Sequence, residues 1–157
     1  MSLDDLDFQI IEQLTEDGRA SLRNIAEQLD ISPSTVSSRM RKLRHEGVIK
    51  GFQPVLDYSQ MGFDLTAVVE VAVSTDMLAE NEHELQELPN VVSLYEVTGD
   101  HDVVMLCKFR DREEMNRLVK NVLSMHGVES THTRVALTAP IENEIPALEK
   151  GREEGSE

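Results

Sequence analysis

The stretch ISPSTVSSRMRKLRHEGVIKGF, residues 31–52, decides how the first third of the chain folds. Ser32 followed by Pro33 is typical of a helix start, because serine caps free backbone N–H groups and proline fits the first helical position. Gly47 is typical of a helix end. Between these residues, apolar side chains recur at helical spacing: Val36, Met40 and Leu43. The stretch predicts a helix up to Gly47 and then short extended pieces over 48–56.

Two further helices are predicted before this stretch. The first follows Ser2, whose spacing to Asp5 predicts a capping box, and its apolar stripe is Leu3, Leu6, Ile10, Ile11 and Leu14. The second follows Ser21 and is shorter. Three helices, with a three-residue gap between the second and third and a β element behind, predict a winged helix-turn-helix over residues 1–52. A generic three-helix bundle would show the same apolar stripes.

The outer face of the third helix separates these alternatives. At about 100° per residue, the side chains opposite its apolar stripe are hydroxyls and cations, and no carboxylate occurs from Ser32 to His45. Small hydroxyls let a helix enter the major groove of DNA closely, and cations suit phosphates. We therefore predict double-stranded DNA as a partner. The candidate DNA-binding residues are Ser32, Ser34, Thr35, Ser37, Ser38, Arg39, Arg41, Lys42, His45 and Lys50.

The distribution of charge supports this prediction. The chain holds 15 Lys and Arg against 30 Asp and Glu, which gives a formal charge of -15 and argues by itself against nucleic acid. Residues 1–31 carry -6 and residues 51–157 carry -13, whereas residues 32–50 carry +4. The single strongly basic stretch is thus the one predicted to face DNA.

Composition also bears on source and location. Ten Arg against five Lys, with carboxylates spread along the chain, are typical of a protein from a salt-saturated cytoplasm, and we expect a halophilic archaeon; an ordinary acidic protein is the alternative. No run of 18 apolar residues occurs, the N-terminus is acidic, and the single Cys107 excludes an internal disulfide framework. We expect a cytoplasmic protein with no membrane partner.

The second half of the chain changes period. Apolar and polar residues alternate from Phe63 to Ser74, which predicts a strand with one apolar face. The elements that follow are a helix over 76–88, strands over 91–98 and 102–109 around a turn, a helix over 111–127 and a strand over 128–138. This order predicts an α+β chain whose second domain, residues 63–140, is a ferredoxin-like βαββαβ sandwich. Residues 53–62 are expected to be a linker, and 141–157 an acidic tail that is disordered at its end.

Taken together, the two halves resemble the Lrp/AsnC (feast/famine) family of transcriptional regulators. The matching residues include Leu6-Asp7, Asp17-Gly18-Arg19, Ile31 to Val36, Gly47 to Phe52, Val97 to Met105 and Gly127 to Thr133. The resemblance implies a DNA-binding regulator of amino-acid or nitrogen metabolism genes. It also implies dimerisation through the C-terminal sandwich, the RAM domain, with the strand near Leu65–Val73 supplying much of the contact. Octamers of such dimers, with amino acids bound between dimers, are further implied.

The resemblance places an effector site at the turn between the second and third strands of the sandwich. Its residues would be Thr98, Gly99, Asp100, His101 and Asp102, with Thr131 and Thr133 on the last strand as neighbours. Exposed backbone amides there suit an α-carboxylate, and the Asp102 carboxylate would suit an α-ammonium. A plain hairpin turn is the alternative, because Gly99 and Asp100 are ordinary turn residues. The family commonly has Phe or Tyr in place of His101, which puts the effector, or the response to it, in doubt.

Other readings have less support in the sequence. Asp100-His101-Asp102, with His126 and His132, raises a metal site, but no HxxxH or CxxC spacing occurs, and we expect no metal and no cofactor. Cys107 is expected to be buried, and no phosphate-binding loop or Ser/His/Asp motif suggests an enzyme. Two alternatives to a sequence-specific regulator remain open: a sequence-tolerant DNA-organising protein, and a stand-alone amino-acid sensor or metabolic enzyme built on the sandwich.

Overall fold

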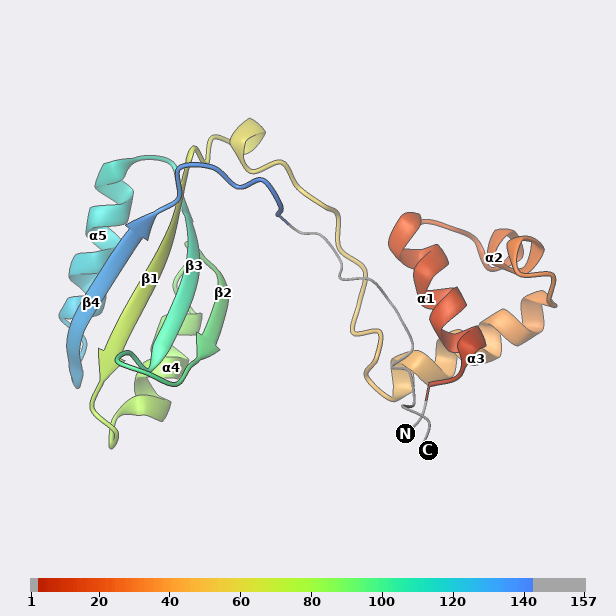
Figure 1. The fold of residues 1–157 in the computed structure, drawn as a ribbon, viewed down its shortest axis with the longest axis horizontal. Coiled ribbons are helices and arrows are strands. Elements are labelled where there is room, and N and C mark those ends of the chain that lie inside the picture. Colours follow the sequence, from red (N-terminus) through yellow and green to blue (C-terminus); the bar gives the residue numbers. More distant parts are fainter. Residues whose placement is uncertain (1–2, 143–157) are drawn as a thin grey trace, which may run out of the picture. The chain divides into compact units, whose positions relative to one another are not determined.

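The computed structural model describes residues 3–142, which form two compact units. The first runs up to Val55 and the second from Leu56 to Glu142, so the division falls inside the predicted linker (Figure 1). The predicted acidic tail, 141–157, lies outside the described residues except for Ile141 and Glu142. No helix in the described range is long and apolar enough to cross a membrane.

The first unit is the predicted three-helix arrangement: α1 (Asp5–Glu16), α2 (Leu22–Gln28) and α3 (Pro33–His45). Both serine caps are confirmed, since the Ser21 hydroxyl accepts from Asn24 N and the Ser32 hydroxyl accepts from Thr35 N. The apolar stripes meet in one core built from Ile10, Ile25, Ala26, Val36 and Leu43. Burial of these side chains holds helices that would be marginal alone.

The start of α1 differs from the prediction. Asp4 is the N-cap, and its Oδ1 accepts from Asp7 N at 2.9 Å while Asp7 Oδ2 accepts from Asp4 N at 3.2 Å. The capping box is therefore Asp4 with Asp7, and the prediction of Ser2 with Asp5 is wrong. Aspartate caps a helix as well as serine does, so both Ser2 and Asp4 were possible N-caps, and the two choices differ by two residues in where the helix begins. The observed register puts Asp7 on the inner side of α1.

The segment after α3 contains no strand, contrary to the predicted β element. Val48 N and Ile49 N both donate to Leu43 O and close the helix. From residue 50 through residue 56, no backbone group bonds to another within the part of the chain that the structure describes. The side chains of Val48, Phe52, Val55 and Leu56 are exposed.

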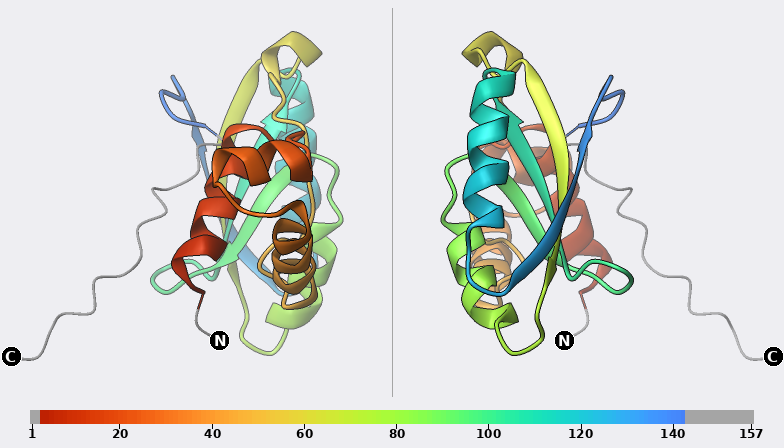
Figure 2. Two further views of the ribbon diagram at one scale, coloured as in Figure 1. Left: turned by 90° about the vertical axis from the view of Figure 1, so that its right-hand side faces the viewer. Right: turned by 90° about the vertical axis from the view of Figure 1, so that its left-hand side faces the viewer.

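The second unit confirms the predicted βαββαβ order. Its elements are β1 (Leu65–Val73), α4 (Leu78–Gln86), β2 (Val91–Glu96), β3 (Val103–Phe109), α5 (Arg112–Leu123) and β4 (Val128–Val135), after a short 3-10 helix at Ser59–Met61. The sheet order is β2-β3-β1-β4, and every neighbouring pair is antiparallel. Both helices lie against one face of the sheet (Figures 1 and 2). Element ends differ from the predicted ones by a few residues.

The two faces of this sheet are unlike each other. Alternation along β1 buries Ala67, Val69, Val71 and Val73 against the helices, with Val103, Met105 and Cys107 of β3 beside them. The opposite face, here called the open face, carries the intervening residues: Thr66, Val68, Glu70 and Ala72 of β1, and Val104, Leu106 and Lys108 of β3. Val68, Ala72, Val104 and Leu106 make part of it apolar, around Glu70, although no helix of this unit covers it. Such a face is typical of a contact with another surface.

Candidate DNA-binding surface and effector loop

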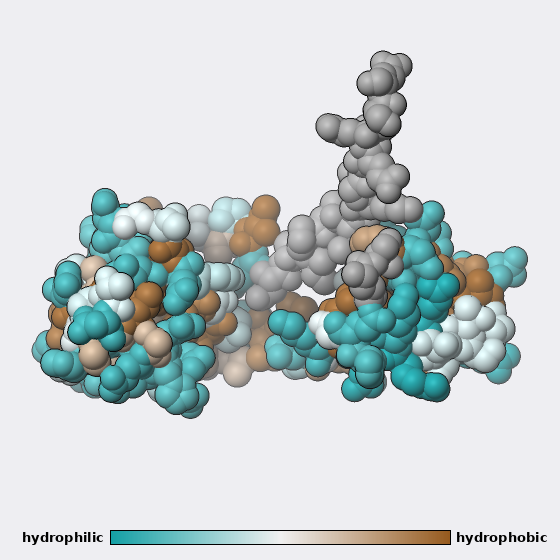
Figure 3. Space-filling model, turned by 90° about the horizontal axis from the view of Figure 1, so that it is seen from below, coloured by the Kyte–Doolittle hydropathy of each residue, from teal (hydrophilic) through white to brown (hydrophobic). Residues whose placement is uncertain are grey.

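The outer side of α3 carries most of the predicted DNA-binding residues. Ser32, Ser34, Ser38, Arg41, His45 and Lys50 are exposed, and Thr35 and Ser37 are partly exposed. The face of the first unit that carries α3 is mostly hydrophilic in Figure 3. Arg44, absent from the prediction, is exposed and lines a surface hollow of about 540 Å³ together with Arg41 and His45. Its place in the basic last turn of the helix is the sequence signal that identifies it.

The hydroxyls at the start of α3 form a local network. Ser32 Oγ lies 2.7 Å from Ser34 Oγ and 2.8 Å from Thr35 Oγ1, while it also accepts from Thr35 N at 3.1 Å. Ser32 is therefore occupied with capping. The network holds the Ser34 and Thr35 hydroxyls in place, where each keeps hydrogen-bonding capacity for a phosphate or a base edge.

Arg39 and Lys42 are separated from the other candidates. Arg39 Nη1 pairs with Asp4 and lies 3.1 Å from Asp7 Oδ1, and Lys42 Nζ lies 3.5 Å from Asp7 Oδ2. The Asp7 side chain is fully buried. The hydrogen bond from Arg39 lowers the pKa of Asp4, and the same bond raises the pKa of Arg39. These two cations hold α3 against α1, whereas Arg41, Arg44, His45 and Lys50 form no ion pair within the described residues.

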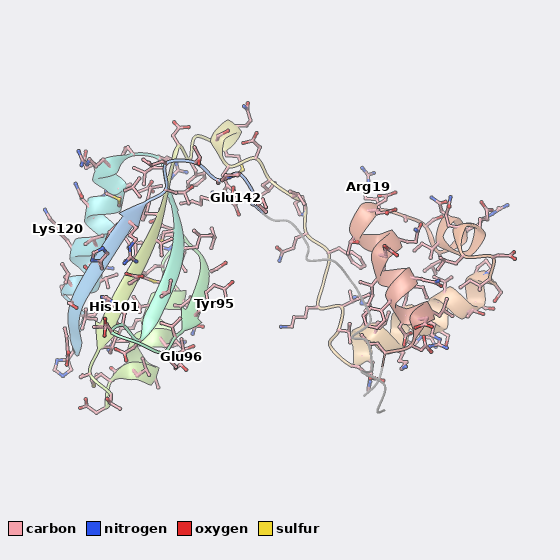
Figure 4. The ribbon with its side chains drawn as sticks, in the orientation of Figure 1. Arg19, Tyr95, Glu96, His101, Lys120 and Glu142 are labelled. Atoms are coloured by element: carbon pink, nitrogen blue, oxygen red, sulfur yellow. The ribbon has the colours of Figure 1, made fainter. Side chains whose placement is uncertain are left out.

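The predicted effector loop is a hairpin between β2 and β3. Val97 N donates to Asp102 O at 2.9 Å, and Gly99 has φ 129°, a conformation that favours glycine. No backbone hydrogen bond within the described residues uses the amides of Gly99, Asp100 or His101. Figure 4 shows His101 at the end of the sheet where this loop lies. Free amides in a turn are a suitable binding place for a carboxylate.

Asp102 has a structural role that the sequence prediction missed. Its Oδ2 accepts from Val73 N at 2.8 Å, and its own N donates to Val71 O at 3.0 Å. The carboxylate therefore anchors the hairpin to the end of β1, which removes support for its expected role as holder of an α-ammonium. Asp100 is the exposed carboxylate of the loop.

Replacing Asp102 with alanine should lower the free energy of unfolding by about 1–2 kcal/mol without any effector, because Val73 N loses its partner. Urea denaturation followed by circular dichroism measures this. Asp100→Ala, in the same loop and exposed, should change stability by less than about 0.5 kcal/mol. If Asp102→Ala leaves stability unchanged but abolishes effector binding, Asp102 is a ligand-binding residue after all.

Thr131 and Thr133 do not share a face with His101. Residues directly opposite in a sheet project to the same side, and these threonines lie opposite Val71 and Val69, which face the helices. His132, between them, lies opposite Glu70 on the open face, and its ring centroid is 6.3 Å from that of His101. The prediction that both threonines neighbour the loop is wrong, because it assumed that Thr131 and Thr133, and not His132, lie on the same face of the sheet as His101.

The loop instead adjoins a polar cluster that the prediction missed. Glu70 pairs with Arg134, and the hydrogen bond from Arg134, helped by His101 and His132, lowers the pKa of Glu70. Glu70 Oε2 is buried without a hydrogen-bond partner among the described residues. The strict alternation of β1 was the signal for Glu70, since it places a carboxylate among Val68, Ala72 and other residues of the open face.

Two further expectations concern reactive groups. Among residues 3–142, no cluster of three or more His, Cys, Asp or Glu side chains could hold a metal ion. Cys107 is buried as predicted, and burial raises the pKa of its thiol to about 12, so it is not a thiolate nucleophile near neutral pH.

A helix-turn-helix with a cationic outer face, joined to a ferredoxin-like sandwich, is typical of DNA-binding regulators that carry a second domain. Residues 3–50 match the winged helix-turn-helix DNA-binding family, and residues 66–146 match the Lrp/AsnC ligand binding domain. The chain belongs to the Lrp/AsnC family of transcriptional regulators, which are DNA-binding proteins and not enzymes.

Individual relatives agree with this assignment. The chain is 43% identical over 137 residues to an uncharacterized HTH-type transcriptional regulator of Pyrococcus furiosus, covering 87% of this chain and 93% of the relative. Its fold is similar to that of E. coli AsnC (TM-score 0.86, 24% identity, 92% and 99% of the two chains). It is also similar to a Neisseria meningitidis regulator in complex with L-Met (TM-score 0.84, 24% identity, 90% and 94%). The Pyrococcus relative gives no support to the expected halophilic origin.

Proposed function

We propose that the chain is a sequence-specific regulator that reads promoter operators with the outer face of α3 and responds to a small effector. The observation that carries the proposal is local charge. A chain of formal charge -15 keeps Arg41, Arg44 and His45 together on one exposed helix that contains no carboxylate. The genes of amino-acid or nitrogen metabolism are the proposed targets, by similarity to the family.

The proposed assembly is a two-fold dimer through the open face. One helix-turn-helix reads only a few base pairs, so two copies reading two half-sites give useful specificity. The apolar residues of the open face support this arrangement, because Val68, Ala72, Val104 and Leu106 are only partly buried within the chain. Octamers built from such dimers are proposed by similarity to the family alone.

The proposed effector is an amino acid bound at the loop 98–102. The unpaired amides of Gly99, Asp100 and His101 suit its α-carboxylate, and the exposed Asp100 carboxylate suits its α-ammonium. The similarity of fold to a regulator solved with L-Met supports the class of ligand. His101 and the adjacent His132 would then contribute to selectivity for the side chain.

A thermal-shift screen of single amino acids tests the effector. At about 100 times its dissociation constant, a ligand adds about 2.7 kcal/mol, which should raise the melting temperature by about 5–10 °C for a chain of this size. Gly99→Val, which places a side chain at φ 129°, should abolish the shift. If no amino acid changes melting or assembly at millimolar concentration, the effector proposal fails while the DNA-binding proposal stands.

A sequence-tolerant DNA-organising protein is the second candidate. It would use the same cations, and the observation in its favour is that Arg41, Arg44 and Lys50 suit phosphates of any sequence. Equal affinity for operators selected from a random pool and for unrelated duplexes would favour it. An operator preference of 1000-fold or more, about 4 kcal/mol, would favour the sequence-specific regulator.

A further inference from the structure

One carboxylate oxygen on the open face has no partner. Glu70 lies in the middle of β1, opposite Val104 of β3 and His132 of β4, and its side chain is 17% exposed. Its Oε1 pairs with Arg134, whereas its Oε2 is buried and accepts no hydrogen bond from any described residue. A buried carboxylate oxygen without a donor lowers stability, and such groups are rare in folded proteins. A donor for Glu70 Oε2 is therefore expected close by.

Two imidazoles are the candidate donors in this part of the chain. The apolar neighbours of Glu70 on the open face have no side-chain N–H, and Arg134 contacts the other oxygen, Oε1. The hydrogen bond from Arg134 is the main cause of the lowered pKa of Glu70, and His101 and His132 add to it, so both rings lie near the carboxylate. His132 is exposed on β4, whereas His101 is partly buried in the loop. His101 is therefore the better placed of the two.

The position of His101 in the loop allows its ring to reach Glu70. Asp102, the next residue, is fixed to β1 through Val73 N. The amides of residues 99–101, in contrast, form no backbone hydrogen bond within the described residues. The His101 ring makes an edge contact with the His132 ring, 6.3 Å between centroids, and no hydrogen bond to a described residue. Since a neutral imidazole carries one N–H, His101 has a donor available for Glu70.

We propose that Glu70 is the positioning residue of the loop 98–102, because its Oε2 accepts a hydrogen bond from the imidazole N–H of His101. The loop then has two arrangements, the one described above and one in which this bond is formed. The bond holds residues 99–101 against the open face and keeps their free amides in one arrangement. An effector carboxylate then binds amides that are already ordered, which reduces the entropy lost on binding. The hydrogen bond needs no effector, and only its role in effector binding rests on the proposed function.

A double-mutant cycle without any effector tests the hydrogen bond. Glu70→Ala, His101→Phe and the double variant are compared in the full-length chain, since phenylalanine keeps a ring but has no N–H. Both tyrosines, Tyr58 and Tyr95, belong to the second unit, so tyrosine fluorescence in urea follows the unfolding of that unit. At pH 8, where an ordinary imidazole is neutral, attraction between charges contributes little. The two changes should be coupled by about 5-fold or more in the unfolding equilibrium constant.

Two comparisons separate this bond from a general effect of the polar cluster. The control cycle pairs Glu70→Ala with His132→Phe, and its coupling should stay below about 2-fold. In a Glu70→Gln background, which keeps a carbonyl acceptor, His101→Phe should destabilise nearly as much as in the unchanged protein, whereas in Glu70→Ala it should have little effect. Coupling below about 2-fold between Glu70 and His101, or stronger coupling of Glu70 to His132 than to His101, overturns the proposal.

Effector affinity tests the positioning role. For the amino acid that gives the largest thermal shift, isothermal titration calorimetry should show an affinity about 10-fold lower in Glu70→Ala and within about 3-fold in Glu70→Gln. The matched control, Glu80→Ala, removes the same charge from an exposed position on α4, which lies against the other face of the sheet, and should change affinity by less than about 2-fold. Equal affinity in Glu70→Ala and in the unchanged protein overturns the positioning role. If no amino acid binds the unchanged protein, the effector proposal fails and the positioning role fails with it, whereas the cycle still decides whether the hydrogen bond exists.

Discussion

Replacing Arg41 and Arg44 with glutamate is expected to weaken operator binding by at least about 100-fold, because two attractive phosphate contacts per copy become repulsive. Both side chains are exposed on α3, and no ion pair within the described residues engages either of them. Lys42 is a poor choice for this test, since Lys42→Glu would face the buried Asp7 and disturb the fold. Operators selected from a random pool by the unchanged protein serve as probes, and fluorescence anisotropy over a range of KCl concentrations measures affinity.

The matched control is Arg112→Glu with Lys120→Glu. These residues are exposed on α5 of the other unit, so the control makes the same change in net charge away from α3. It should lower affinity by only about 2- to 5-fold through the overall field. Circular dichroism of both variants confirms folding. If the α3 variant binds as tightly as its control, α3 is not the recognition helix.

Most of the architecture could be predicted from the sequence because it depends on local periodicity. The stripe of Ile10 and Ile11, the Ser32-Pro33 start and the alternation around Val69 each require only a few neighbouring residues. The order of strands then follows from the βαββαβ pattern, since short right-handed connections leave few arrangements. The resemblance to the Lrp/AsnC family covered both domains and added the expected functions of gene regulation and effector binding.

The site was less predictable because its details depend on contacts between distant residues. Whether Arg39 faces DNA or α1 depends on Asp7, 32 positions away, and on a cap register that Ser2 and Asp4 left ambiguous. The side of β4 that carries Thr131 depends on its register with β1, including a bulge at Ala72 and Val73. Asp102 was predicted to bind the effector because its hydrogen bond from Val73 N joins residues 29 positions apart, which the local sequence does not reveal. Local patterns contain no information on such pairings.

Asp7 is the residue whose replacement should cost the DNA-binding unit the most stability among the charged groups named above. Asp7→Ala is expected to lower the free energy of unfolding by about 2–3 kcal/mol, because it removes half of the capping box and the buried counterion of Arg39 and Lys42. The full cost of breaking a buried pair, about 3–5 kcal/mol, does not apply, since both cations keep contact with water and Arg39 keeps Asp4. Urea denaturation followed by circular dichroism at 222 nm measures the loss.

The choice of control decides what this loss means. Glu12→Gln removes one negative charge from the exposed side of the same helix, and it should change stability by less than about 0.5 kcal/mol. Asp7→Asn retains the size of the side chain and a capping acceptor. Its free energy of unfolding should therefore lie between those of Asp7→Ala and Glu12→Gln, and the difference from the unchanged protein isolates the contribution of charge. If Asp7→Asn is as stable as the unchanged protein, the ion pairs contribute nothing and the cap alone fixes α1. If it loses most of what Asp7→Ala loses, the Asp7 carboxylate fixes the rotation of α3, and it determines which cations of that helix are available to DNA.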